Sequence, residues 1–166
     1  QSALDIGTGS GCIAVSLALE GLQVTAMDIS ADALRIAGGN ASMLQADVEL
    51  VQEDILHPAS SNQQWDIIVS NPPYIRHMEA GDMEATVLEH EPHTALFVPD
   101  SDPLLFYRAI GQYAWEHLGS QGKLWFEINR EFHRETCQLL EGFGFTGIEA
   151  RKDFYDNYRF VKATRP

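Results

Sequence analysis

The tetrapeptide Asn71-Pro72-Pro73-Tyr74 carries the side chains best suited to hold a planar amide or amino group. Two prolines fix the backbone and remove two N–H donors, so the Pro72 carbonyl is a candidate acceptor, and Asn71 adds an amide oxygen. Tyr74 adds an aromatic face. A rigid loop without a function is the simpler interpretation. However, the tetrapeptide follows a segment that we expect to be a strand and faces a glycine loop, so we predict that it receives a substrate nitrogen.

The glycine-rich loop Gly7-Thr8-Gly9-Ser10-Gly11 lies between an apolar run and a helix-compatible stretch. Alternate glycines permit unusual backbone angles and the close approach of a ligand. The helix that follows offers free N–H groups to a carboxylate or phosphate. Glycines often only make a tight turn, and dinucleotide-binding loops have Gly or Ala at the position of Cys12. The loop therefore indicates a ligand site but argues against a nicotinamide cofactor.

Acidic residues follow the next two predicted strands. Asp28 ends the second strand, 17 residues after Gly11, where a carboxylate can accept hydrogen bonds from both hydroxyls of a ribose. Asp28 could instead cap a helix, but Ser30 is better placed for that role, which leaves Asp28 without a structural duty. Asp54 and Ile55 follow the third strand and could contact an adenine amino group and ring. An ordinary turn explains this last pair equally well.

Apolar segments alternate with helix-compatible ones through most of the chain. We predict strands at residues 3–6, 22–27, 48–51, 65–69, 123–128, 145–150 and 158–163, and helices at residues 12–19, 31–37, 104–117 and 131–140. Gly38-Gly39 should end the second helix and Gly142 the last. This alternation is typical of a doubly wound α/β sheet, mostly parallel, with its ligand at the carboxyl ends of the strands. The connection at residues 152–157 is too short for a crossover helix, so the last two strands should be antiparallel.

The stretch from Arg76 to Ser101 is long and acidic, and we predict a loop that covers the site as a lid. It contains His77, His90 and His93, which could bind a metal ion. Pro92 lies between the last two histidines and disrupts their presentation on a helix. We therefore expect solvent-exposed histidines and no metal site.

Composition excludes several classes of protein. The chain has 166 residues, which suits one domain, and no apolar run of the roughly 18 residues that a membrane span requires. The whole net charge of −13 arises within residues 1–100, and such a domain should repel nucleic acid. Cys12 and Cys137 do not make a disulfide framework, so we expect buried free thiols and a cytoplasmic location. The chain begins with Gln1 rather than Met, so we expect a piece of a longer protein.

The motifs together resemble the class I S-adenosylmethionine-dependent methyltransferases that act on amino groups. The resemblance rests on the segment DIGTGSG after a strand, on Asp28, and on NPPY after a later strand. Further matches narrow the resemblance to the HemK/PrmC family, the protein-(glutamine-N(5)) methyltransferases of peptide chain release factors. These matches are Glu91-Pro92, Ala95-Leu96-Phe97, Leu105-Phe106-Tyr107-Arg108, and Lys152-Asp153-Phe154 through Arg159. The resemblance runs from about Leu4 to Ala163.

The resemblance implies that residues 1–166 form a methyltransferase domain that binds S-adenosylmethionine, and that the helical N-terminal domain of the family is absent. The glycine loop would wrap the methionine and ribose, Asp28 the ribose hydroxyls, and Asp54 with Ile55 the adenine. Asn71 and the Pro72 carbonyl would hold the amide of a glutamine in a Gly-Gly-Gln motif. The implied cofactor residues are Gly7, Thr8, Gly9, Ser10, Gly11, Asp28, Asp54, Ile55 and Asn71, and the implied substrate residues are Asn71, Pro72, Pro73 and Tyr74.

Two alternatives stay open at this point. A nucleic-acid methyltransferase could use the same acceptors on an exocyclic base amine, with Tyr74 stacked on a flipped base, although the charge of −13 counts against it. A catalytically silent S-adenosylmethionine-binding module is the second alternative, and the intact NPPY segment argues against it. We expect a cytoplasmic enzyme of translation termination whose partner is a release factor, with no direct binding to membrane or nucleic acid.

Overall fold

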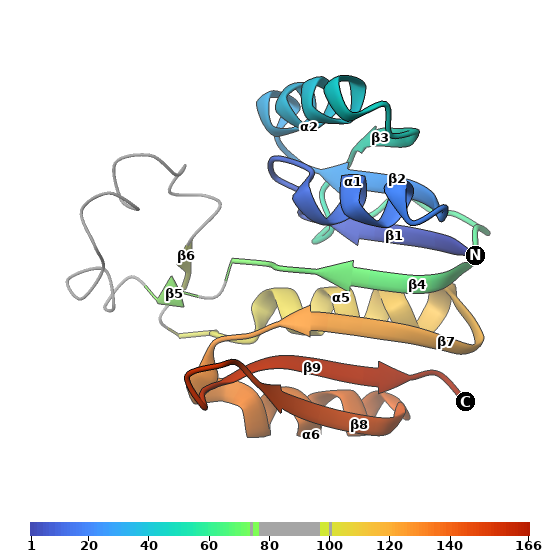
Figure 1. Cartoon of the computed structure of the whole chain (residues 1–166). Helices are drawn as coiled ribbons and strands as arrows, with labels where there is room; N and C mark the ends of the chain where they lie inside the picture. Colours follow the sequence, from blue (N-terminus) through green and yellow to red (C-terminus); the bar gives the residue numbers. More distant parts are fainter. Residues whose placement is uncertain (74, 77–96, 100) are drawn as a thin grey trace.

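A seven-stranded sheet forms the centre of the molecule (Figure 1). The structure is a computed structural model and describes residues 1–73, 75–76, 97–99 and 101–166. The strand order is β3-β2-β1-β4-β7-β9-β8. The strands are β1 (Ser2–Ile6), β2 (Gln23–Asp28), β3 (Val48–Gln52), β4 (Trp65–Ser70), β7 (Leu118–Glu127), β8 (Thr146–Lys152) and β9 (Tyr158–Thr164). A separate pair, β5 (Ile75–Arg76) and β6 (Phe97–Val98), is parallel.

The sheet is parallel from β3 to β7, and β9 runs antiparallel to both of its neighbours. The predicted α/β sheet with an antiparallel end is therefore confirmed. Helices cover both faces: α1 (Cys12–Leu19), α2 (Ala31–Leu44), α5 (Leu105–His117) and α6 (His133–Phe143), with a 3-10 turn η2 (Arg130–Phe132) before the last. The alternation of side chains along β1 explains this arrangement, because successive residues of a strand point to opposite faces. Leu4 and Ile6 pack with α5 and α6, whereas Ala3 packs with α1.

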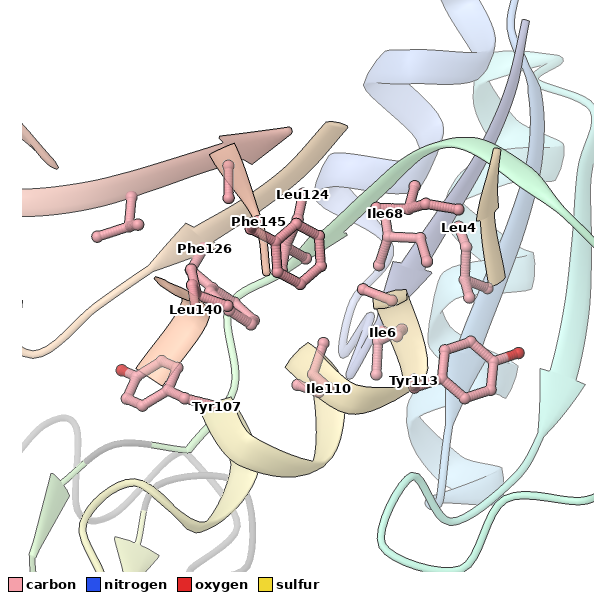
Figure 2. Packing of buried hydrophobic residues seen from close by; sticks show 14 of the residues in the cluster. Leu4, Ile6, Ile68, Tyr107, Ile110, Tyr113, Leu124, Phe126, Leu140 and Phe145 are labelled. Atoms are coloured by element: carbon pink, nitrogen blue, oxygen red, sulfur yellow. The ribbon is translucent and has the colours of Figure 1, made fainter. Parts of the chain in front are cut away.

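The larger core lies between α5, α6 and the middle of the sheet, and Figure 2 shows its packing. Ile68 and Phe126 from the strands meet Ile110 and Tyr107 from α5, and each is at most 1% exposed. The Tyr107 and Phe126 rings meet edge to face at 5.3 Å, a favoured geometry for aromatic pairs. This packing makes the carboxyl ends of β1, β4 and β7 a rigid platform.

Gly38-Gly39 does not end α2, contrary to the prediction. The helix continues to Leu44 and ends where Gln45 adopts a left-handed conformation with φ 57°. A Cβ atom on Gly38 would lie 2.9 Å from Leu50 Cδ1. Glycine at this position therefore allows close packing of the helix on β3, which the local sequence does not reveal.

Two other element boundaries differ from the predictions by three residues or more. Helix α6 passes Gly142 and ends before Gly144, which has the positive φ (99°) typical of a helix terminus. Strand β7 starts at Leu118 rather than Lys123, because α5 leads directly into an irregular stretch that pairs with Trp65. Gly21 (φ 87°) follows the end of α1, as predicted.

Both cysteines are free thiols, but they are not buried as expected. Cys12 is exposed at the start of α1 and its Sγ lies 3.3 Å from Ser10 Oγ. Cys137 is partly exposed on α6. The apolar neighbours of Cys12 in the sequence face inward, whereas Cys12 itself lies on the outer side of the helix. Within the described ranges, no helix is long and apolar enough to cross a membrane.

Candidate functional site

Three of the predicted site segments begin at the same level of the sheet, directly after a row of three residues that pair across neighbouring strands. In this row Ile6 of β1 lies between Met27 of β2 and Ser70 of β4. The residues that follow are Gly7, Asp28 and Asn71. Neighbouring strands lie about 4.8 Å apart, so Asp28 and Asn71 are separated by roughly 10 Å with the glycine loop between them. The structure therefore brings the glycine loop, Asp28 and Asn71 together at one edge of the sheet.

The glycine loop has the backbone that its sequence predicts. Gly7, Gly9 and Gly11 have φ angles of 71°, 55° and 80°. The N–H groups of Gly7 and Thr8 donate to the Met27 carbonyl at 2.8 and 3.1 Å, which joins the loop to β2. A Cβ atom on Gly7 or Gly9 would meet nothing within 4 Å, so the space beside both residues is open. The loop is a cradle with room for a ligand against its backbone.

Gly11 allows close packing between α1 and α2. A Cβ atom at this position would lie 2.9 Å from Ala37 Cβ, so only glycine lets α1 begin this close to α2. From α2, the Asn40 amide donates to the Ser10 carbonyl at 2.8 Å. The sequence reasoning missed Asn40, and no pattern in the sequence singles it out.

Asp5 holds the glycine loop and the start of α1 together. It is 1% exposed, and its Oδ2 accepts hydrogen bonds from Thr8 Oγ1 at 2.6 Å and from the Ala14 N–H at 3.1 Å. Its Oδ1 is buried without a hydrogen-bond partner in the described part of the chain. Burial raises the pKa of Asp5 to about 6, although both hydrogen bonds act against this shift. An acidic residue inside an apolar strand was the sequence signal for Asp5, and we assigned it no role.

Asp28 has a structural duty that we did not predict. Its Oδ2 accepts from the Gly9 N–H and its Oδ1 from the Ser30 N–H, both at 2.9 Å. Ser30 caps α2 as predicted, with its Oγ accepting from the Ala33 N–H. Each carboxylate oxygen can accept more than one hydrogen bond, and Asp28 is only half-buried. Asp28 therefore keeps acceptor capacity for a further donor.

Asp54 and Ile55 lie next to Asp28, because the Glu53 N–H donates to the Asp28 carbonyl at 3.0 Å. The Asp54 carboxylate accepts from the His57 imidazole and the Leu56 N–H, each at 2.9 Å. The hydrogen bond from His57 is the main cause that lowers the pKa of Asp54 from its ordinary value.

The ordinary-turn interpretation thus explains Asp54 well. Ile55 is partly buried and packs against the main core. Both residues therefore follow β3 beside Asp28, at the same edge of the sheet as the glycine loop.

Asn71, Pro72 and Pro73 continue from β4 at the same edge. Asn71 is exposed and Pro72 is buried. Ser70, which precedes them, is 1% exposed, and its Oγ donates to the Ile6 carbonyl at 2.6 Å. The sequence reasoning missed Ser70, whose signal was a polar residue at the end of an apolar strand. Tyr74 lies outside the described residues.

Several other predictions also fall outside the described part of the chain. They are the lid over most of residues 76–101, the histidines at 77, 90 and 93, and the motif residues at 91–92 and 95–96. Among residues that the structure describes, no group of three His, Cys, Asp or Glu side chains could hold a metal ion. A cavity of about 370 Å³ lies at the opposite edge of the sheet, lined by Ser2, Gln23 and Trp65 among others, and is not part of this site.

Comparisons with known proteins agree with this architecture. A relative from Flavobacterium psychrophilum, called a release factor glutamine methyltransferase, is 48% identical over 161 residues, which is 96% of this chain and 56% of the relative. One of the same name from Bacteroides thetaiotaomicron is 44% identical over 98% of this chain and 59% of its own length. The chain thus spans less than two thirds of these relatives.

A solved 16S rRNA methyltransferase from T. thermophilus, in complex with AdoMet and guanosine, superposes with a TM-score of 0.71 at 18% identity. The superposition covers 99% of this chain and 37% of that one, and shows the fold alone. The family model named Methyltransferase small domain matches residues 1–96, which include the glycine loop, Asp28 and Asn71. The chain belongs to the methyltransferase small domain family.

Proposed function

We propose that this chain transfers a methyl group from S-adenosylmethionine to the side-chain amide nitrogen of a glutamine in a peptide chain release factor. The observation that supports the proposal is the row Met27–Ile6–Ser70, directly after which the glycine loop, Asp28 and Asn71 begin side by side. The names of the two bacterial relatives support the choice of substrate. The acceptor glutamine is expected within a Gly-Gly-Gln motif.

The cradle fits the proposed cofactor. Open space beside the backbone of Gly7 and Gly9 allows close approach of the methionine and ribose groups. The half-buried Asp28 carboxylate keeps lone pairs for the ribose hydroxyls while it holds the Gly9 N–H. Asp54 and Ile55, one strand further out, are the proposed adenine contacts.

The main chemical difficulty lies at the acceptor site, where a weakly nucleophilic amide nitrogen must be oriented. Bound S-adenosylmethionine would supply a methyl group that its sulfonium already activates, so the chain needs no nucleophilic residue. The lone pair of an amide nitrogen is delocalised into its carbonyl, which makes the nitrogen a poor nucleophile. The Asn71 amide oxygen and the Pro72 carbonyl are proposed to accept hydrogen bonds from its two N–H groups and to orient it. Such positioning lowers the activation free energy by several kcal/mol, with an upper range of roughly 7–11 kcal/mol.

The same two acceptors stabilise the positive charge that develops on the nitrogen, because fixed dipoles need no reorganisation during the reaction. The surplus proton leaves to water, so we assign no general base. Tyr74 is proposed to pack against the glutamine amide, a role that rests on the sequence alone. Since release factors act in translation termination, the proposal places the chain in the cytoplasm.

A methyl-transfer assay with labelled S-adenosylmethionine tests the proposal. The substrates are an intact release factor, its variant with Ala in place of the Gly-Gly-Gln glutamine, and single-stranded and duplex nucleic acid. We expect label only in the intact release factor. Label in nucleic acid would show that the acceptor is an exocyclic base amine, and label in neither would refute the proposed function of this chain.

A further inference from the structure

The connection between β8 and β9 presents two aromatic side chains that the proposed chemistry does not use. Phe154 is 107% exposed and Tyr155 is 87% exposed, the two largest values among the exposed large hydrophobic residues of the described chain. Neither side chain is buried in the core, so neither stabilises the fold through hydrophobic packing. Aromatic residues are enriched at the energetically dominant positions of protein interfaces because each buries a large area with few rotatable bonds.

Hydrogen bonds hold the backbone of this turn, which suits a role in binding. The Asp153 carboxylate accepts from the N–H groups of Tyr155 and Asn157 at 2.9 and 3.0 Å. The backbone pairs across the turn, with the Asp153 N–H donating to the Asn157 carbonyl at 2.9 Å. At its base, Tyr158 stacks on His133 at 4.0 Å. A surface that is already ordered loses little conformational entropy when a partner binds.

The turn lies at the same edge of the sheet as the candidate site. Strand β8 is antiparallel to β9, and β9 is antiparallel to β7, so β8 ends where β4 and β7 end. Figure 1 shows the connection beyond the arrowhead of β7, on the side where the chain leaves β4. The register row that contains Ser70 continues through Phe126 and Val161 to Ala150. The chain runs several residues past this row before it turns, so the turn projects roughly 10 Å beyond it.

The lateral distance to Asn71 suits a polypeptide substrate. Two to three strand spacings separate β4 from the hairpin, which is roughly 10–15 Å. An extended chain covers about 3.3–3.6 Å per residue. A segment whose glutamine lies at Asn71 therefore reaches the turn with its flanking residues, about four or five positions away.

The charges of the turn favour a protein partner over nucleic acid. Residues 149–159 contain three bases and three acids, and these groups pair with one another. The ion pairs are Arg151–Glu149, Lys152–Asp156 and Arg159–Asp153. Binding to nucleic acid depends mainly on unpaired positive charge that faces phosphates. This turn instead offers apolar aromatic area with no excess of charge.

We infer that the Phe154-Tyr155 turn is a docking surface for apolar side chains of the substrate protein, in the segment that flanks the acceptor glutamine. The inference rests on the proposed function, since it takes the substrate to be a polypeptide held at Asn71. The turn acts on substrate affinity and not on the methyl-transfer step.

The test compares a double variant, Phe154→Ser with Tyr155→Ser, with the unaltered chain on two substrates. One substrate is an intact release factor. The other is a short peptide with two residues on each side of the acceptor glutamine, too short to reach the turn. We expect the double variant to raise KM for the release factor by about 30-fold or more, since a dominant interface residue contributes at least that much. We expect kcat for the release factor, and kcat/KM for the peptide, to stay within about twofold of the unaltered chain.

A matched control is Ile36→Ser on α2, whose apolar side chain is 46% exposed. This control should leave both substrates unaffected. Unchanged KM for the release factor in the turn variant would overturn the inference and leave the proposed function intact, as would an equal loss on both substrates. If the turn variant loses binding to a single-stranded oligonucleotide instead, the surface serves nucleic acid and the inference is wrong. If the unaltered chain labels neither substrate, the proposed function is refuted, and the inference, which rests on it, is refuted too.

Discussion

Ser70 Oγ donates a hydrogen bond of 2.6 Å to the carbonyl oxygen of Ile6, although the two residues are 64 positions apart in the chain. They also pair in the register of β1 and β4. Ile6 is the last residue before the glycine loop and Ser70 the last before Asn71. Two buried strands, and not a loop, therefore determine the separation between the cofactor cradle and the acceptor site.

Replacement of Ser70 by Ala should weaken this connection. We expect the free energy of unfolding to fall by about 1–3 kcal/mol, because a buried carbonyl loses a donor, and kcat to fall because the two sites separate. Urea unfolding and the methyl-transfer assay measure the two effects. Ser2→Ala is the control, because Ser2 Oγ joins the same strands at their other ends, at an exposed position, and should change stability by less than about 0.5 kcal/mol. Equal effects of the two substitutions would contradict the prediction.

Asn71→Ala should lower kcat for methyl transfer by about 100-fold or more, the usual loss when one group that stabilises transition-state charge is removed. The affinity for S-adenosylmethionine should change much less, since the glycine loop and Asp28 remain. Calorimetry measures the affinity, and labelled methyl transfer measures the rate. Asn62→Ala, in an exposed connection before β4, is the control and should change neither quantity. Near-normal methyl transfer by the Asn71 variant would remove Asn71 from the acceptor site.

Asp28→Ala should weaken cofactor binding by about 1–3 kcal/mol, through loss of its hydrogen bonds to the ribose. The effect includes a loosened glycine loop, because Asp28 also accepts from the Gly9 N–H. Asp32→Ala, at an exposed position in the first turn of α2, is the matched removal of a carboxylate nearby. Titration calorimetry of both variants with S-adenosylmethionine decides the point, and an unchanged dissociation constant for the Asp28 variant would refute the ribose role.

Asp5 should make stability depend on pH in a predictable direction. Burial raises its pKa from 3.8 to about 6, so the folded chain binds this proton more tightly than the unfolded chain. The cost of ionising Asp5 is absent below about pH 3.8, grows as pH rises, and is complete above about pH 6. The full cost is about 3 kcal/mol.

We therefore expect the free energy of unfolding to fall by up to about 3 kcal/mol, relative to that of Asp5→Asn, between about pH 4 and pH 7. Urea titrations of both proteins at each pH measure this difference. The subtraction removes the contribution of other carboxylates, including Asp54 and Asp153, whose pKa values are lowered. If the difference in free energy of unfolding between the two proteins stays constant with pH, the raised pKa of Asp5 is contradicted.

Gly39→Ala should raise the free energy of unfolding by about 0.5–1 kcal/mol. Gly39 lies inside α2, is exposed, and has nothing within 4 Å of an added Cβ atom, so alanine adds helix propensity without a clash. Gly38→Ala is the matched control, because its Cβ atom would lie 2.9 Å from Leu50 Cδ1. Thermal or urea unfolding should give the Gly39 variant a higher free energy of unfolding than the original chain. The Gly38 variant should be less stable than the Gly39 variant. The reverse order would mean that α2 frays at the glycine pair.

The sequence by itself determined the doubly wound fold, the glycine loop, the Ser30 cap, and the placement of Asp28 and Asn71 at one edge of the sheet. These features follow from local patterns: apolar runs form strands, and parallel strands bring their carboxyl ends together. Only the tertiary structure decided the rest, because it depends on which distant atoms approach each other. Helix α2 continues past Gly38 to Leu44, with the Leu50 side chain packed against Gly38. The Ser70 hydroxyl finds its partner only across two paired strands. Asp5 has a raised pKa only because the folded core excludes water from it.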